Sequence, residues 1–223
     1  MIKETVFFLR HGPATSRRQA EMGPVEFQKW LAKEADEDGQ KALREELVED
    51  LRGDILEVGA GTGAMFSYYG AGANVVALEP DDDFRAAAEE AATNAQASIR
   101  IVGGAGESLP FPDASFDAIV ASTVLCSVTS MEQTLAEFKR VLKPGAGLRL
   151  LEHVRSEHWP EGVLMDVFNP LWLRINKVGC NWNRRPVEAV RDAGFQIDDV
   201  EPHKFFSPAA PATMPLRLIR ARI

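Results

Sequence analysis

A glycine-rich run, with an acidic residue at its start and another further along the chain, carries the strongest chemical signal in the sequence. The run is Glu57-Val58-Gly59-Ala60-Gly61-Thr62-Gly63, and it joins a predicted buried strand to a predicted helix. Glycines at such a junction let the chain turn tightly and bring backbone N–H groups against a ligand. Glu79 ends the next predicted strand, twenty residues after Gly59, where a carboxylate can accept hydrogen bonds from both hydroxyls of a ribose. These residues predict a site for a nucleotide-type ligand.

The spacing alone leaves two ligands open. Gly59, Gly61 and Ala64 also satisfy the looser dinucleotide fingerprint G-x-G-x-x-G/A, so both NAD and S-adenosylmethionine are compatible with it. A third interpretation is that the glycines only form a turn and bind no ligand. It does not explain why a strand, a helix and a distant acid all occur at the spacing that a nucleotide site requires.

Alternating strands and helices must position these residues. Strands are predicted at 55–58, 74–78, 99–102, 118–121, 148–154, 195–200 and 216–223, and helices near 64–69, 84–95, 131–142 and 187–193. We expect Pro144-Gly145 to end the third of these helices and Pro186 to begin the fourth. Segment 159–182 reads as apolar and irregular, and 207–215 as a loop. The alternation predicts an α/β fold, a Rossmann-like three-layer sandwich whose mostly parallel seven-stranded sheet has helices on both faces.

Two amphipathic helices are predicted before this core. The first starts at Pro24 and carries Phe27 and Trp30, and the second has leucines on one face and is expected to stop at Gly53. We expect one compact domain, in which residues 1–53 form an N-terminal helical cover and residues 54–223 the catalytic unit.

The acidic balance and the few cysteines argue against several classes of function. A net charge of -8 without a long Lys/Arg cluster disfavours nucleic acid as a partner. Cys126 and Cys180 have no CxxC spacing and the four histidines have no metal-ligand spacing, so no metal site is expected. The chain has neither a run long enough for a membrane span nor a signal-peptide pattern. We expect a cytoplasmic protein with a small-molecule or small-peptide partner and no nucleic acid; the oligomeric state stays open.

Four longer strings resemble the class I S-adenosylmethionine-dependent methyltransferases, and this resemblance chooses between the two ligands. The strings are DILEVGAGTG, LEP, ESLPFPDASFDAIVAS and LAEFKRVLKPGAGLRLLEHV, in that order between Asp54 and Val154. The resemblance implies a methyltransferase that binds S-adenosylmethionine and releases S-adenosylhomocysteine. It implies cofactor contacts to the methionine and ribose parts from Glu57, Gly59, Gly61, Gly63, Glu79, Pro80, Ser122 and Thr123.

The chain departs from this family at one position. Many relatives carry an acid where Ala105 stands, and that acid contacts the adenine amine. Here the adenine is expected to meet the backbone of Ala105 and Gly106, or the side chain of Glu107.

A narrower resemblance suggests the acceptor. The strings GAGE, TVLCSV, LEHV and Gly179-Cys180-Asn181 look like those of the microsomal alkyl-thiol methyltransferases, whose apolar N-terminal anchor has no counterpart here. This resemblance implies methyl transfer to sulfur, in a thiol or disulfide of a small, largely apolar metabolite or peptide natural product, as in secondary-metabolite or antibiotic biosynthesis. Open alternatives are N-, O- or C-methylation of a small metabolite or lipid, an NAD-dependent oxidoreductase, and a non-catalytic S-adenosylmethionine-binding partner protein.

His153 is the candidate catalytic base, because it ends the fifth predicted strand at the edge where open α/β sheets bind ligands. A histidine that is only hydrogen-bonded at a strand end is the competing interpretation. For the acceptor pocket we expect Phe168, Trp172 and Asn181 on one side and Phe27 and Trp30 on the other, although ordinary core packing would also explain these side chains.

Two further features are expected to carry no chemistry. Cys126 is interpreted as a small buried side chain. The string Leu9-Arg10-His11-Gly12 looks like the motif of histidine phosphatases, but the core strands already belong to another fold, so the match is interpreted as chance.

Overall fold

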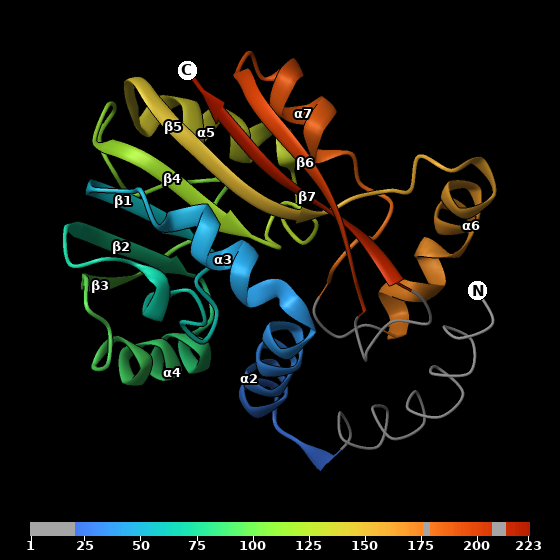
Figure 1. The fold of residues 1–223 in the computed structure, drawn as a ribbon, viewed down its shortest axis with the longest axis horizontal. Helices are drawn as coiled ribbons and strands as arrows, with labels where there is room; N and C mark the ends of the chain where they lie inside the picture. The colour runs from blue at the N-terminus through green and yellow to red at the C-terminus, as the bar shows by residue number, and fades with distance from the viewer. Residues whose placement is uncertain (1–20, 176–178, 207–212) are drawn as a thin grey trace.

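Seven strands form one twisted sheet in the computed structural model, which describes residues 21–175, 179–206 and 213–223 (Figure 1). Their order is β3-β2-β1-β4-β5-β7-β6. The strands are β1 (Gly53–Val58), β2 (Ala73–Glu79), β3 (Ser98–Gly103), β4 (Phe116–Ser122), β5 (Leu142–His153), β6 (Gln196–Phe206) and β7 (Thr213–Arg222). Strands β1 to β5 are parallel, whereas β7 runs antiparallel to both β5 and β6. The mostly parallel Rossmann-like sheet predicted from the sequence is therefore confirmed.

The strand order reverses between β1 and β4, and this reversal positions the site. From β1 the chain moves outward through β2 to β3, then returns to place β4 on the other side of β1. The connections that leave β1 and β4 therefore part in opposite directions at the carboxyl edge of the sheet. Open α/β sheets bind ligands in the crevice that opens at such a point.

Helices cover both faces of the sheet. The described α-helices are α2 (Pro24–Ala35), α3 (Lys41–Val48), α4 (Asp82–Ala92), α5 (Met131–Val141), α6 (Trp159–Ile175), which lies apart from the sheet (Figure 1), and α7 (Pro186–Asp192). The buried side chains of α3 and α4 join one apolar cluster, and those of α5 and α7 join the cluster on the opposite face. In Figure 1 α3 lies in front of the sheet and α5 behind it.

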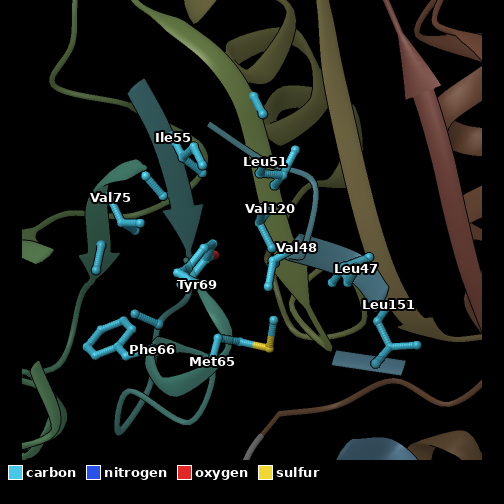
Figure 2. Close-up of a cluster of buried hydrophobic side chains, with 14 of the residues drawn as sticks. Leu47, Val48, Leu51, Ile55, Met65, Phe66, Tyr69, Val75, Val120 and Leu151 are labelled. Atoms are coloured by element: carbon cyan, nitrogen blue, oxygen red, sulfur yellow. The ribbon is translucent and has the colours of Figure 1, made fainter. Parts of the chain in front are cut away.

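The predicted N-terminal helices are present and almost continuous. The short π-helical turn η1 (Asp36–Gln40) joins α2 to α3, with Gly39 at a φ of 105°. Asp36 ties this corner to the core, since it accepts hydrogen bonds from Arg44 and from the Tyr68 hydroxyl, both at 2.8 Å. Leu47 and Val48 then pack with Ile55 and Leu151 of the sheet (Figure 2).

Several predicted boundaries are wrong. Residues 64–69 form no α-helix but a turn and the 3₁₀ helix η2 (Phe66–Tyr68), because Gly61 and Gly63 take φ values of 57° and 81° that interrupt a right-handed helix. The helix expected to end at Gly53 ends at Val48, and Gly53 begins β1.

The fifth strand begins at Leu142, before Pro144-Gly145, because Leu142 already pairs with Phe116 of β4 across an irregularity in the ladder. The segment predicted to be irregular at 159–182 is mostly the helix α6, and residues 213–215 belong to β7. The rest of the predicted loop, 207–212, and the string at residues 9–12 lie outside the described residues.

Leu47→Ala tests whether the N-terminal cover is part of the core. Leu47 is completely buried, so truncation removes buried methyl groups and leaves a cavity, at a cost of about 2–5 kcal/mol in the free energy of unfolding. Urea unfolding measures it, with Leu164→Ala as the matched control because Leu164 is 54% exposed. A loss below about 1 kcal/mol for Leu47→Ala would mean that α3 does not belong to the folded core.

Candidate active site

A cavity of about 680 Å³ opens at the carboxyl edge of the sheet, within the range of about 300–1,000 Å³ typical of small-molecule sites. It lies where β1, β2 and β4 end. Nine of the residues predicted to bind the cofactor line it: Gly59, Gly61, Glu79, Pro80, Ala105, Gly106, Glu107, Ser122 and Thr123. Helix α2 contributes Pro24, Phe27 and Gln28 from the other side. The predicted residues thus gather in one cavity, except Glu57 and Gly63.

The glycine turn brings the chain back against the end of β2. The N–H groups of Gly59 and Ala60 both donate to the carbonyl of Leu78, at 2.8 and 3.1 Å. Gly59 has a φ of 68°, and a Cβ there would come within 2.6 Å of the Val124 side chain. Only glycine therefore lets this turn and the loop after β4 approach each other across the cavity.

Glu79 presents its carboxylate at the rim of the cavity. Its Oε2 accepts a hydrogen bond from Gly61 N–H at 2.9 Å, and Oε1 accepts one from Asp81 N–H at 3.1 Å. These bonds fix the rotamer of a side chain that is only 7% exposed. Each oxygen keeps a further lone pair for a ribose hydroxyl.

Glu57 lies beneath the glycine turn rather than on the cavity wall. Its carboxyl is 2% exposed and lies beside Tyr69, whose hydroxyl is itself buried. Burial raises the pKa of Glu57 to about 8, against the weaker opposing effects of Tyr69 and Arg44. Arg44, which opposes this rise in the pKa of Glu57, forms an ion pair with Asp36 at 2.8 Å.

The loop after β4 is held by a buried acid that the sequence analysis missed. Both Val124 N–H and Leu125 N–H donate to Oε1 of Glu152 at 2.9 Å, and Cys126 N–H donates to Oε2 at 3.4 Å. Glu152 is completely buried, and burial raises its pKa to about 7 although these N–H groups oppose the shift. The sequence signal that could have revealed Glu152 is an acidic residue within the largely apolar run of β5.

Thr123 takes a strained conformation at the same loop. Its φ is 59°, in the left-handed region that β-branched residues avoid, and its N–H donates to Leu151 O at 2.7 Å. Such strain persists where the surrounding structure enforces it, which happens most often at functional sites.

Ala105, Gly106 and Glu107, the residues predicted to lie near the adenine, line the cavity. Glu107 Oε1 already accepts a hydrogen bond from Thr129 N–H at 2.6 Å. Glu107 therefore ties the loop before α5 to the turn after β3, and the Ala105 carbonyl in that turn accepts a hydrogen bond from Ser108 N–H at 3.2 Å.

His153 does not line this cavity but joins two cysteines next to it. Its Nδ1 lies 3.5 Å from Cys180 Sγ, and the two sulfur atoms and one ring nitrogen all lie within 4.8 Å of one another. Cys126 Sγ contacts Thr123 O at 3.3 Å and Ser127 Oγ at 3.4 Å, and both of those residues line the cavity. Neighbouring Cys180 and burial raise the pKa of Cys126. Cys126 is buried as expected, but its surroundings are polar.

The residues predicted for the acceptor pocket fall into two places. Phe27 lines the cavity and packs against Trp30, with ring centroids 5.7 Å apart. On the far side Trp172 stacks on Trp182 at 4.8 Å, and Asn181 binds Asn169 and the carbonyl of Cys126. Phe168 is 48% exposed on α6 and is not among the residues that line the cavity.

Helix α6 lies apart from the helices that cover the sheet (Figure 1). Its outer side exposes large apolar side chains: Trp159, Val163, Leu164, Val167, Phe168, Leu171 and Leu173. Among the described residues, none of the helices is both long and apolar enough to cross a membrane.

The cavity fits S-adenosylmethionine. A carboxylate stands at its rim for the ribose, and the glycine turn leaves backbone close to the cavity where a Cβ at Gly59 would strike Val124. The profile of a family described as "Methyltransferase domain" matches residues 56–150. The fold is also that of a solved S-adenosylmethionine-dependent methyltransferase from Methanosarcina mazei, with a TM-score of 0.61 at 21% identity over 77% of this chain and 92% of that one.

Curated relatives extend the likeness. The chain is 35% identical to thiol S-methyltransferase TMT1A of Homo sapiens, over 63% of this chain and 59% of that protein. It is 34% identical to thiol S-methyltransferase TMT1B of Homo sapiens, over 72% of this chain and 68% of that protein. It is also 34% identical to the ubiquinone/menaquinone biosynthesis C-methyltransferase UbiE of Citrobacter koseri, over 57% of this chain and 53% of that protein.

The chain belongs to the S-adenosylmethionine-dependent methyltransferases. The chain spans 59–68% of the length of the human thiol S-methyltransferases it matches, and its methyltransferase domain holds a cavity that fits S-adenosylmethionine as methyl donor. This membership decides against the NAD-dependent oxidoreductase that the glycine spacing left open.

Glu79→Gln tests the ribose contact. The amide keeps the shape but loses a charge and one acceptor oxygen, so affinity for S-adenosylhomocysteine should fall about 10–100-fold, the effect of losing a hydrogen bond to a charged group. Isothermal titration measures the affinity, with Glu90→Gln on the exposed side of α4 as the control. Equal affinity of Glu79→Gln and the wild type would remove Glu79 from the cofactor site.

Proposed function

We propose that the enzyme methylates a sulfur atom of a small, largely apolar thiol, in a metabolite or a peptide natural product. The observation that carries the choice of sulfur is the extent of the likeness to TMT1B, which covers 171 residues, well beyond the methyltransferase domain at 56–150. The string Gly179-Cys180-Asn181 lies outside that shared domain, and Asn181 N–H donates to the carbonyl of Cys126, in the loop after β4 that also lines the cavity.

The cofactor supplies an electrophilic methyl group on a sulfonium, so the chain itself needs to align and desolvate the acceptor. Helix α2 supports this role, because Pro24, Phe27 and Gln28 line the cavity opposite the glycine turn. We therefore propose residues 1–53 as the cover of the site and residues 54–223 as the methyltransferase domain.

His153 is the proposed catalytic residue. A free thiol has a pKa of about 8.5 and reacts as the thiolate, so a group that favours the anion speeds methyl transfer. His153 ends β5, one strand from the Ser122-Thr123 corner that lines the cavity, and its ring lies among polar and sulfur groups. Phe27 and Trp30 on one side and Trp172 and Asn181 on the other are proposed to shape the acceptor region.

A second candidate is methylation of a carbon atom, which the similarity to the C-methyltransferase UbiE favours. That match covers 134 residues and so reaches less of the chain than the match to TMT1B. Sulfur therefore remains the first choice.

The proposal predicts transfer from radiolabelled S-adenosylmethionine to sulfur acceptors in a matched panel. The panel holds small thiols, a disulfide-containing cyclic peptide, amines, phenols and a quinol. His153→Ala should bind S-adenosylhomocysteine within about twofold of the wild type yet lower kcat/KM for thiols by about 10²-fold or more, the usual effect of losing an acid–base group. His158→Ala is the matched control, since His158 is exposed.

Label found only in amines, phenols or the quinol would overturn the choice of sulfur. Undiminished thiol methylation by His153→Ala would remove His153 from the reaction while leaving the acceptor class intact.

A further inference from the structure

Three potential metal ligands meet beside the cavity although they are far apart in the sequence. Cys126 comes from the loop after β4, His153 from the end of β5, and Cys180 from the segment that follows α6. Only the folded sheet brings them together, which is why metal-ligand spacing in the sequence gives no sign of them. Among the described residues, no further Cys, His, Asp or Glu completes the group.

The donor set suits a thiophilic divalent cation. Zinc binds thiolate sulfur at about 2.3 Å and imidazole nitrogen at about 2.0 Å, so neighbouring ligand atoms of a tetrahedral site lie roughly 3.3–3.8 Å apart. The 3.5 Å between Cys180 Sγ and His153 Nδ1 already falls in that range. All three ligand atoms lie within 4.8 Å of one another. Small side-chain rotations therefore bring the remaining two pairs of atoms to the distances of a tetrahedral zinc site.

Hydrogen bonds to the carbonyls of Cys126 and Cys180 hold the two cysteine segments in place independently of any ion. Asn181 N–H donates to Cys126 O at 2.8 Å, and the Trp172 indole N–H donates to Cys180 O at 2.9 Å. Cys126 and Cys180 are 2% and 8% exposed. The two cysteine positions are thus buried and preorganised, with the partly buried His153 beside them, which favours tight binding.

We propose that Cys126, His153 and Cys180 bind a zinc-like divalent cation whose fourth position takes the sulfur of the acceptor. Three protein ligands and one open position are the pattern of catalytic zinc sites. The second half of the proposal rests on the thiol function proposed above, and it gives His153 its role there, as a ligand of the cation that stabilises the acceptor thiolate.

The reaction then balances. The acceptor thiol loses its proton to solvent when its sulfur binds the cation. An electron pair of that sulfur forms the new bond to the methyl carbon, and the pair of the breaking carbon–sulfur bond stays on the donor sulfur, which leaves S-adenosylhomocysteine. The thioether product carries no charge and is a weaker ligand, so it can dissociate. Two protein thiolates neutralise the divalent cation.

Cobalt substitution tests the cation site without any measurement of methyl transfer. The full chain is reduced, stripped with a chelator and titrated with Co²⁺, whose thiolate complexes absorb in the near ultraviolet and visible. We expect one cobalt per chain, displaced by one zinc, and binding at least about 100-fold weaker in Cys126→Ser, Cys180→Ser and His153→Ala, because each removes a direct ligand. His158→Ala should bind like the wild type.

Two results would overturn the cation site: reduced, folded protein with two titratable thiols that takes up neither metal, or purified protein that carries a Cys126–Cys180 disulfide. Adding a small thiol to the cobalt protein should change the thiolate absorption. An unchanged spectrum would overturn the fourth-ligand role, whereas the acceptor panel alone decides whether sulfur is methylated.

Discussion

A single buried carboxylate, that of Glu152, holds the loop on which both sides of the site depend. It accepts hydrogen bonds from the N–H groups of three successive residues, Val124 to Cys126. On one side this loop presents Thr123 and Val124 to the cofactor cavity, with Val124 against Gly59. On the other side it places Cys126 next to His153 and Cys180. Glu152 and the glycine turn of β1 thus fix the cofactor cavity and the sulfur-rich group in one arrangement.

This arrangement is costly to the folded state. Burial raises the pKa of Glu152 from 4.5 to about 7, and that of Glu57 from 4.5 to about 8. A carboxyl whose folded pKa is raised favours the folded state fully only below the unfolded pKa, and this contribution is lost as the pH rises through the folded pKa. Stability therefore falls between pH 4.5 and about 7 through Glu152, and between pH 4.5 and about 8 through Glu57. The strained φ of Thr123 lowers the stability of the folded state further. All three residues thus reduce stability while they fix the site at the carboxyl edge of the sheet.

Much of the fold could be predicted from the sequence because its signals are local. The strands are short apolar runs, and the glycine turn and Glu79 lie within 23 residues of one another, so spacing was enough to find the cavity. The helix expected at 64–69 was wrong because Gly61 and Gly63, which follow the strand, both have positive φ. Long-range contacts accompany these conformations: Gly61 N–H donates to Glu79 Oε2, and a Cβ at Gly63 would strike Ala91 of α4.

Features that depend on long-range contacts could not be predicted from the sequence. Strand β5 starts early because Phe116 pairs with Leu142, a contact that periodicity does not report. The meeting of Cys126, His153 and Cys180 requires β4, β5 and the segment after α6 to be placed together. Glu152 is hidden in a strand otherwise interpreted as apolar, and its role appears only when the loop N–H groups are seen to converge on it.

The most direct measurement compares the ligand affinities of Glu152→Gln and Glu157→Gln. Glu157 is the control because it is an exposed acid that follows β5 by a few residues. S-adenosylhomocysteine affinity and the KM for the methyl acceptor are measured on protein shown to be folded. The amide keeps the size of Glu152 but turns an N–H donor toward Cys126 N–H, so both affinities should weaken together, by about 5–100-fold for a buried group left unsatisfied. Affinities of Glu152→Gln that match those of Glu157→Gln would contradict the account, since the loop would then hold both sides of the site without the carboxylate.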